Sequence, residues 1–287
     1  MNIGLLAIIA AIICWGFGDF FIQRTTRKIG VAEALFFIGL IGSIILFPFV
    51  FSQLPLLFST SNIFLSLLFL GLMDIFVAVV NMQAYKVGKL SVVDPILVLE
   101  LPITIFLGIV ILKEGISSAQ FALSFLIFIG IFLVSLRKSF SAKMVFEKGV
   151  KLALITAVGM GILNFMYGTF SREASPLLAV WSASFIHVIL CGAFLFFRGR
   201  LFQLGKDFAK NKKIIFAEGV FDTLAWTFYS IAMVSLPISI TTAITESYPV
   251  LAVLLGIYIN KEKINFNQKL GVGMTIVSAV ALGMTIL

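Results

Sequence analysis

Stretches of about 20 consecutive apolar residues recur along almost the whole chain, separated by short polar segments. A helix of about 20 residues rises about 30 Å, the thickness of the hydrocarbon layer of a bilayer. The stretches are continuous, whereas strands of a membrane barrel alternate in polarity, so they predict membrane-spanning helices. We expect ten spans, at residues 3–22, 32–51, 63–85, 91–112, 118–136, 149–170, 177–197, 214–235, 237–259 and 266–287.

Composition excludes a soluble globular domain. Hydrophobic residues make up 61% of the chain and charged residues 12%, with a mean hydropathy of +1.14. In soluble domains about 45–50% of the residues are apolar and about 25% are charged. An apolar excess of this size has to face lipid. The first stretch has neither a cationic lead-in nor a small-residue cleavage site, so we expect a permanent span and not a signal peptide.

The net charge of +8 is explained by membrane topology. All Lys and Arg residues except Lys113 and Arg172 flank the segments that follow spans 1, 3, 5, 7 and 9. The positive-inside rule places these segments in the cytoplasm and both termini outside. No basic stripe with interleaved aromatic residues lies outside the short loops, so we expect no nucleic-acid partner.

The two halves of the chain match each other at an offset of 148 residues. At this offset the matched residues are Gly71 and Gly219, Asp74 and Asp222, Ala84 and Ala232, Ser91 and Ser239, Gly108 and Gly256, Glu114 and Glu262, and Gln120 and Gln268. We therefore divide the chain into a first repeat at 1–137, a basic linker at 138–148 and a second repeat at 149–287. Because five spans is an odd number, the second repeat enters the membrane from the opposite side. The expected fold class is all-α, a polytopic membrane protein of ten transmembrane helices in two inverted five-helix repeats, which is an architecture of secondary transporters.

Short motifs in both halves make the chain similar to EamA-type transporters of the drug/metabolite transporter superfamily. They are Trp15-Gly16 in span 1, the series Ala84, Pro102 and Glu114, and its repeat Ala232, Pro249 and Glu262. The resemblance covers essentially the whole chain. It implies a central cavity lined by spans 1, 3, 4, 6, 8 and 9, with spans 5 and 10 at the periphery. The second half carries Gly159-Met160-Gly161 in place of Trp-Gly, and the family usually keeps both termini in the cytoplasm, opposite to the charge bias here.

Acidic residues inside the spans are the first candidates for a site, because an Asp at a helix centre costs about 2.5–3.5 kcal/mol in lipid. Glu100 and Glu246 stand two and three residues before Pro102 and Pro249. A proline frees the carbonyl four residues earlier, so these helices are expected to kink beside a carboxyl group and expose the carbonyls of Val98 and Thr245. We expect Glu100 and Glu246 to bind substrate or a proton, and Asp74 and Asp222 to be the second choice.

Other polar residues receive simpler interpretations. Asp19 is expected to form an ion pair at headgroup level, and Asp94-Pro95 to begin a helix. Glu114 and Glu262 are expected to be solvated or at headgroup level at span ends, and His187 to be a neutral, hydrogen-bonded residue. Aromatic residues on the spans that the resemblance turns inward are candidate cavity residues, although lipid-facing rings would give the same pattern: Trp15, Tyr85, Trp226, Tyr229 and Tyr248. The prolines Pro102 and Pro249 are candidate cavity residues as well.

The function expected from these patterns is secondary active transport of a small organic metabolite or drug-like solute across the cell (plasma or inner) membrane by alternating access, not enzymatic catalysis. Proton coupling and exchange both stay open as energy sources, as do the substrate and the oligomeric state. The alternatives are a flippase for a lipid-linked metabolite and, more remotely, an intramembrane aspartyl protease, because Gly16-Phe17-Gly18-Asp19 matches the Gly-x-Gly-Asp string of that class. Cys14 and Cys191 lie in apolar stretches and no ATP-binding motif is present, so no metal and no cofactor are expected. The expected partners are the small-molecule substrate and the lipid bilayer.

Overall fold

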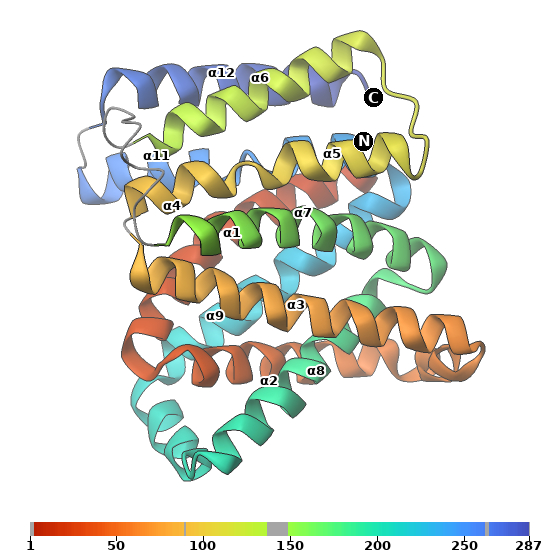
Figure 1. Ribbon diagram of the computed structural model, residues 1–287, viewed down its shortest axis with the longest axis vertical. Helices are drawn as coiled ribbons and strands as arrows, with labels where there is room; N and C mark the ends of the chain where they lie inside the picture. The colour runs from red at the N-terminus through yellow and green to blue at the C-terminus, as the bar shows by residue number, and fades with distance from the viewer. Residues whose placement is uncertain (1–2, 89, 137–148, 262–263, 287) are drawn as a thin grey trace.

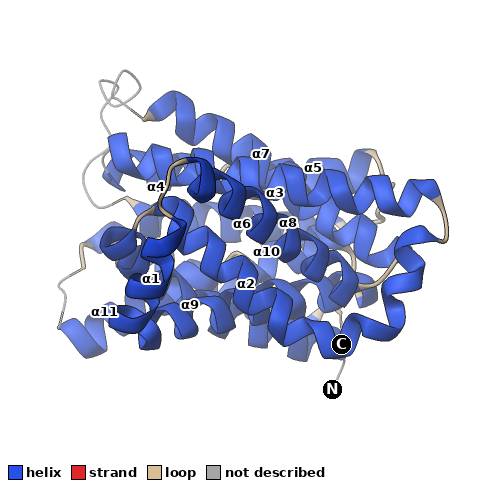
Figure 2. Ribbon diagram, turned by 90° about the horizontal axis from the view of Figure 1, so that it is seen from below, coloured by secondary structure: helices blue, strands red, loops and turns tan. Residues whose placement is uncertain are grey.

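The computed structural model describes residues 3–88, 90–136, 149–261 and 264–286, and these residues form helices joined by short loops, with no strand among them (Figure 1). The first half contains α1 (Ile3–Ile29), α2 (Val31–Val50), the 3₁₀ helix η1 (Phe51–Phe58), α3 (Ser61–Val87), α4 (Leu90–Leu97), α5 (Glu100–Val110) and α6 (Ser118–Ser135). The second contains α7 (Val150–Glu173), α8 (Pro176–Phe197), α9 (Leu201–Ser235), α10 (Ile238–Thr245), α11 (Tyr248–Asn260) and α12 (Phe266–Met284). Figure 2 shows how short the connections between the helices are.

Within the described ranges, eight helical stretches are long and apolar enough to cross a bilayer, by length and composition. They are Val31–Phe58, Ser61–Val87, Val92–Val110, Ser118–Ser135, Val150–Glu173, Pro176–Phe197, Leu201–Ser235 and Ile238–Leu255. A shorter apolar helix, Ile3–Gly18, lies within α1. The chain is thus a multi-pass helical membrane protein, and the count of ten stays a prediction that depends on α1 and α12.

Two of the spans are broken where the prolines predicted a kink. Between α4 and α5, helical structure is interrupted at the two residues before Glu100, Val98 and Leu99. Between α10 and α11 it is interrupted at Glu246 and Ser247. The expected free carbonyl at Val98 is wrong, because it accepts a hydrogen bond from the Leu101 N–H at 3.2 Å. The chain closes a tighter turn there, which satisfies the oxygen that Pro102 leaves without its helical donor.

Structural details recur at the offset found in the sequence. Three pairs of features are 148 residues apart: the bounds of α4 and α10, the positive φ of 54° at Lys113 and Lys261, and the capping boxes Ser117–Gln120 and Asn265–Gln268 that begin α6 and α12. A positive φ is uncommon outside glycine, so its recurrence at matched lysines is a specific mark of one backbone path used twice.

Helices from the two halves pack against each other in a reciprocal pattern. α1 packs on α9 and α3 on α7, while α2 packs on α8 and α6 on α12. Exchanging the two halves converts the α1–α9 contact into the α3–α7 contact. The α2–α8 and α6–α12 contacts are unchanged by the same exchange, because each joins a helix to its own counterpart. Figure 1 places both chain ends at one side of the molecule, and the end of α6 and the start of α7 at the other.

Close approach of α6 and α12 depends on Gly271 and not on Gly273, two residues further along α12. A Cβ at Gly271 would lie 2.5 Å from the Gly130 carbonyl oxygen and 2.8 Å from the Val134 nitrogen, whereas nothing lies within 4 Å of a Cβ at Gly273. We expect Gly271→Ala to destabilise the protein by about 1–3 kcal/mol through overpacking. Gly273→Ala adds the same methyl group to the same helix, and it should leave stability unchanged or raise it, since alanine favours helix.

The measurement is the apparent unfolding temperature of the purified protein in detergent. A lower temperature for Gly271→Ala but not for Gly273→Ala supports the close α6–α12 contact. Equal temperatures for the two variants would contradict it.

Candidate functional site

A cavity of about 1030 Å³ lies between the two halves. All six spans implied by the resemblance line it, but the expected peripheral position of spans 5 and 10 is only partly correct. The end of α6 contributes Ile131 and Val134, and the start of α12 contributes Gln268. Because α6 and α12 pack against each other, and α6 also contacts α4 and α11, their adjoining ends close one side of the cavity.

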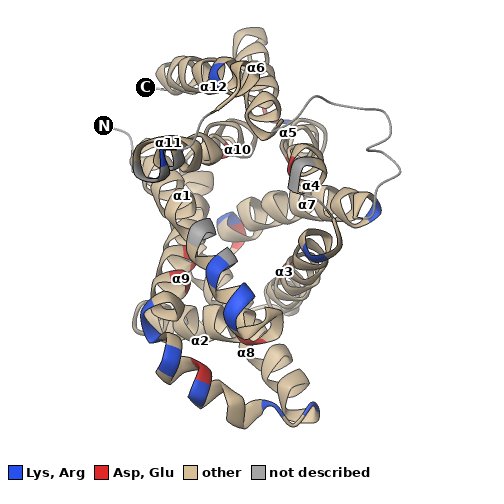
Figure 3. Cartoon of the chain, turned by 90° about the vertical axis from the view of Figure 1, so that its left-hand side faces the viewer, with Lys and Arg blue, Asp and Glu red and all other residues tan. Residues whose placement is uncertain are grey.

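The cavity extends to one face of the membrane domain. Arg27, Lys86, Asp94 and Gln268 line it, and all four lie near the basic ends of their helices. This end is viewed in Figure 3, where Lys and Arg gather on the helix ends nearest the viewer. No lining residue comes from the turn after α5, which lies at the opposite end of the molecule. The structure is therefore a state whose cavity reaches the basic face.

All four acidic candidates lie in the wall of this cavity: Asp74, Glu100, Asp222 and Glu246. So do five of the other candidates: Trp15, Tyr85, Trp226, Tyr248 and Pro249. The structure thus brings together residues that lie more than 200 positions apart in the chain.

Pro102 and Tyr229 do not line the cavity, which corrects the expectation for both. Pro102 is exposed on α5, because two residues along a helix turn its side chain about 200° away from Glu100. Tyr229 is fully buried behind the Trp15 ring at a centroid distance of 5.1 Å. Its hydroxyl lies 2.6 Å from Thr242 Oγ1, so Tyr229 joins α9 to α10.

Asp74 lies at a junction of three helices. The Tyr167 hydroxyl of α7 donates a hydrogen bond of 2.8 Å to Asp74 Oδ2, and His187 Nε2 of α8 lies 3.6 Å from the same oxygen. The expectation of a hydrogen-bonded His187 is wrong, since neither ring nitrogen has a hydrogen-bond partner among the described groups. The three side chains form a buried carboxylate, phenol and imidazole cluster in the cavity wall, and imidazole and carboxylate are the usual carriers of protons in such positions.

Several neutral polar groups of the wall, which the sequence analysis missed, have no internal partner. Asn81 Oδ1, Thr156 Oγ1 and Thr223 Oγ1 are buried, line the cavity and form no hydrogen bond within the described part of the chain. A buried polar atom without a partner costs about 1–3 kcal/mol, so these oxygens are available to water or a polar solute. The only signal in the sequence that points to Asn81 is the occurrence of a polar asparagine within an apolar span.

Aromatic rings form the inner end of the cavity. Tyr167 stacks on Trp226 at 4.4 Å, and Trp15 lies 5.2 Å from Trp226 and 5.8 Å from Tyr248. These four rings come from α7, α9, α1 and α11, and all of them line the cavity. Such a surface can take an apolar group or hold a cation over a ring face.

Beyond the rings, Glu114 closes the opposite end, and its expected solvated position is wrong. Its carboxylate accepts hydrogen bonds from the Ile238 N–H at 2.6 Å, the Ser239 N–H at 2.9 Å and the Ser239 hydroxyl at 2.7 Å. Arg172 lies 3.4 Å from the same carboxylate and donates to the carbonyls of Met233 and Leu236, each at 2.8 Å. An acid of the first half therefore caps α10 of the second, where the helix dipole favours a negative charge.

The remaining predictions for single residues have mixed outcomes. Asp94 and Pro95 lie inside α4 and do not begin it, because the helix starts at Leu90; Asp94 is instead a cavity residue that the sequence analysis missed. The side chain of Asp19 and the whole of Glu262 lie outside the described residues. Among the residues that are described, no group of three or more His, Cys, Asp or Glu side chains is placed to hold a metal ion.

A multi-pass helical protein with a polar cavity at the interface of two similar halves belongs in the class of membrane transport proteins. The model of the EamA-like transporter family matches residues 2–136 and again residues 147–284, and the chain belongs to this family. One solved crystal structure of a protein is similar with a TM-score of 0.78 at 14% sequence identity, over 99% of this chain and 96% of the other, which shows the fold alone. No curated protein sequence matches significantly.

Proposed function

We propose that the protein is a secondary active transporter that moves a small organic solute across the plasma or inner membrane by alternating access. Ten spans in two inverted five-helix halves provide the moving parts. In this mechanism, rocking one half against the other exposes a central site to each side of the membrane in turn.

The helix lengths and the repeat support ten spans and inversion. α1 has 27 residues and α12 has 19, lengths of about 40 and 28 Å, which suffice to cross or nearly cross the hydrocarbon layer. Counting both gives five spans in each half, and an even total agrees with two termini at one side of the molecule (Figure 1). The family model matching once in each half supports the same division.

The observation that carries the proposal is a cavity with one reachable end and one closed end. It reaches the basic face at Lys86 and Asp94, and the contacts of Glu114 close the region beyond the rings. By the positive-inside rule the open end faces the cytoplasm. Alternating access requires a second state, in which the contacts of Glu114 break and the basic end closes.

The wall favours a polar or cationic organic solute. Asp74, Glu100, Asp222 and Glu246 supply negative charge, while Trp226 and its neighbouring rings supply an apolar surface. Carboxylates in such a wall suit an amine, and the rings suit the hydrocarbon part of the same molecule. The number of ionisable groups favours this function over a flippase, whose cavity would need a hydrocarbon-lined path for lipid chains.

The test is an untargeted comparison of the metabolites retained by cells with and without the protein, followed by uptake of the affected compound into proteoliposomes. We expect uptake to fall at least tenfold for Trp226→Ala, which removes a ring of the cavity. Phe121→Ala, which removes an exposed ring of α6, is the matched control and should transport normally. No protein-dependent uptake of any affected compound, or equal uptake by both variants, would contradict the proposal.

A further inference from the structure

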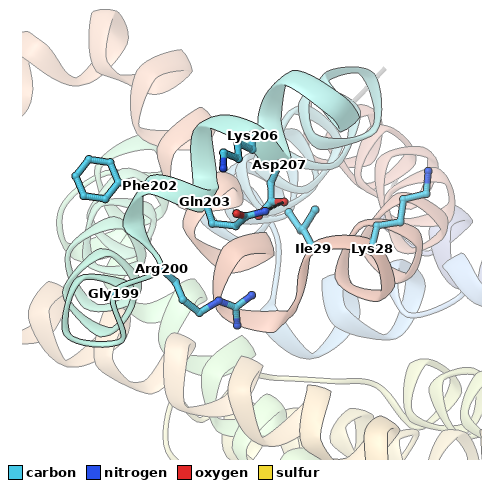
Figure 4. A pocket seen from close by; sticks show the side chains of 8 residues that line it. All are labelled: Lys28, Ile29, Gly199, Arg200, Phe202, Gln203, Lys206 and Asp207. Carbon is cyan, nitrogen blue, oxygen red and sulfur yellow. Dashed lines mark hydrogen bonds between the residues drawn. The ribbon is translucent and has the colours of Figure 1, made fainter.

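A second pocket, of about 430 Å³, lies where α1, α8 and α9 meet at the basic face. The end of α1 provides Lys28 and Ile29, and the turn before α9 provides Gly199 and Arg200. The first turns of α9 provide the rest: Phe202, Gln203, Lys206 and Asp207 (Figure 4). It shares no lining residue with the central cavity, so it is a separate site.

The pocket carries a net positive charge, since it has three cations and one acid. Glu33, whose side chain is almost fully buried, holds Arg200 in place through a contact of 2.8 Å between Oε1 and Nη2, while the Arg200 side chain stays 55% exposed. Lys28 and Lys206 add two further ammonium groups from different helices. A guanidinium fixed on one side and open on the other is suited to a phosphate group.

Asp207 gives the pocket a hydrogen-bond acceptor beside these cations. Its Oδ1 accepts a hydrogen bond of 3.2 Å from Gln203, whereas its Oδ2 is buried and has no partner within the described residues. A carboxylate oxygen accepts a hydrogen bond from a hydroxyl group. The pocket thus offers cations for a phosphate and an acceptor for a neighbouring hydroxyl.

The surroundings place the pocket at the lipid headgroups. Helical geometry is lost at Asn211, with φ −124° and ψ 16°, which separates the first turns of α9 from the rest. The 24 residues that follow, up to Ser235, rise about 36 Å and already suffice to cross the bilayer. Phe197 and Phe202, which are 85% and 91% exposed, flank the cations, a combination typical of helices that lie in the membrane interface.

We infer that this pocket binds the headgroup of an anionic membrane lipid of the phosphatidylglycerol type. Arg200, Lys28 and Lys206 contact the phosphate, and Asp207 accepts a hydrogen bond from a headgroup hydroxyl. The acyl chains extend past Phe202, whose ring projects away from the charged side chains in Figure 4. A free phosphate has no apolar part that could contact the exposed rings, so we assign the pocket to a lipid headgroup.

The experiment measures phosphatidylglycerol bound to the purified protein in detergent, by native mass spectrometry over a lipid titration. Each Lys near anionic headgroups contributes about 1 kcal/mol, so Lys28→Gln combined with Lys206→Gln should weaken binding about thirtyfold. Lys151→Gln combined with Lys269→Gln is the control, because it removes the same charge from exposed positions near the starts of α7 and α12. It should bind phosphatidylglycerol like the wild type.

Three results would overturn the assignment. The first is equal phosphatidylglycerol binding by the two double variants. The second is equally strong binding of phosphatidylcholine, whose headgroup has no net charge, to the wild-type protein. The third is displacement of phosphatidylglycerol by equimolar glycerol 3-phosphate, which would identify the ligand as a soluble phosphate. Each measurement detects binding directly and does not depend on the transport function.

Discussion

Replacing Glu114 by alanine is expected to lower net transport at least tenfold by opening the end of the protein that this residue closes. The carboxylate is 7% exposed, bonds the start of α10 three times and lies beside Arg172. Removing this acceptor leaves the part-buried N–H groups of Ile238 and Ser239 unpaired, at about 1–3 kcal/mol for each group, and the loss of a helix cap alone costs about 1 kcal/mol. Even a 3 kcal/mol penalty on the closed state shifts the ratio of the two states by roughly a hundredfold.

Transport and accessibility together test this expectation. In a background without Cys14 and Cys191, a Leu236→Cys probe should be protected from a membrane-impermeant thiol reagent, because Leu236 is buried beside the closed end. Adding Glu114→Ala should expose it to reagent on the side of the termini. Glu173→Ala is the matched control, since Glu173 is an exposed acid at the same end of the molecule. Unchanged labelling in the Glu114 variant would show that its contacts do not close this end.

The features that the sequence predicted correctly depend on local chemistry. Hydropathy located the helices because each span must satisfy its own backbone hydrogen bonds in lipid. Proline located the two breaks because a missing N–H acts within one helical turn. The cost of a charge in lipid identified Asp74 and Glu246 as inward-facing residues, and both line the cavity.

The errors concern partners that are remote in sequence. Glu114 looked like a headgroup residue because its actual partners, at the start of α10, lie 124 and 125 residues away. Tyr229 and Trp226 stand one turn apart on α9, and only packing decides that the first is covered while the second lines the cavity. Sequence gives the helices but not their rotation about their own axes, which neighbouring helices determine.

The repeat itself reveals an asymmetry between Asp74 and Asp222 that the sequence comparison alone did not weigh. Asp74 is bonded by Tyr167 and faces His187. At the 148-residue offset, Tyr167 and His187 of the second half match Asp19 and Gly39 of the first half. The imidazole that can exchange a proton with Asp74 therefore has no counterpart at the matched position of the first half, which is a glycine.

This asymmetry leads to the expectation that Asp74→Asn uncouples transport from a proton gradient. Asparagine keeps the shape of the side chain and an acceptor for the Tyr167 hydroxyl, but it cannot ionise. Concentrative uptake into proteoliposomes under a pH gradient should fall at least tenfold, while exchange of labelled for unlabelled solute without a gradient should persist. Substituting the matched acid, as Asp222→Asn, should reduce both activities to the same degree, because that residue is expected to act on the solute and not on the proton.

His187→Gln provides the complementary measurement, because it leaves Asp74 able to ionise but removes the neighbouring proton carrier. Its uptake should keep a gradient-driven component whose dependence on pH differs from that of the wild type. A protein with Asp74→Asn that still concentrates solute against a gradient would assign proton coupling elsewhere, with Glu100 and Glu246 the next carboxyls in the same wall. Loss of exchange as well as uptake would place Asp74 in solute binding, since a coupling group is dispensable when no gradient drives the cycle.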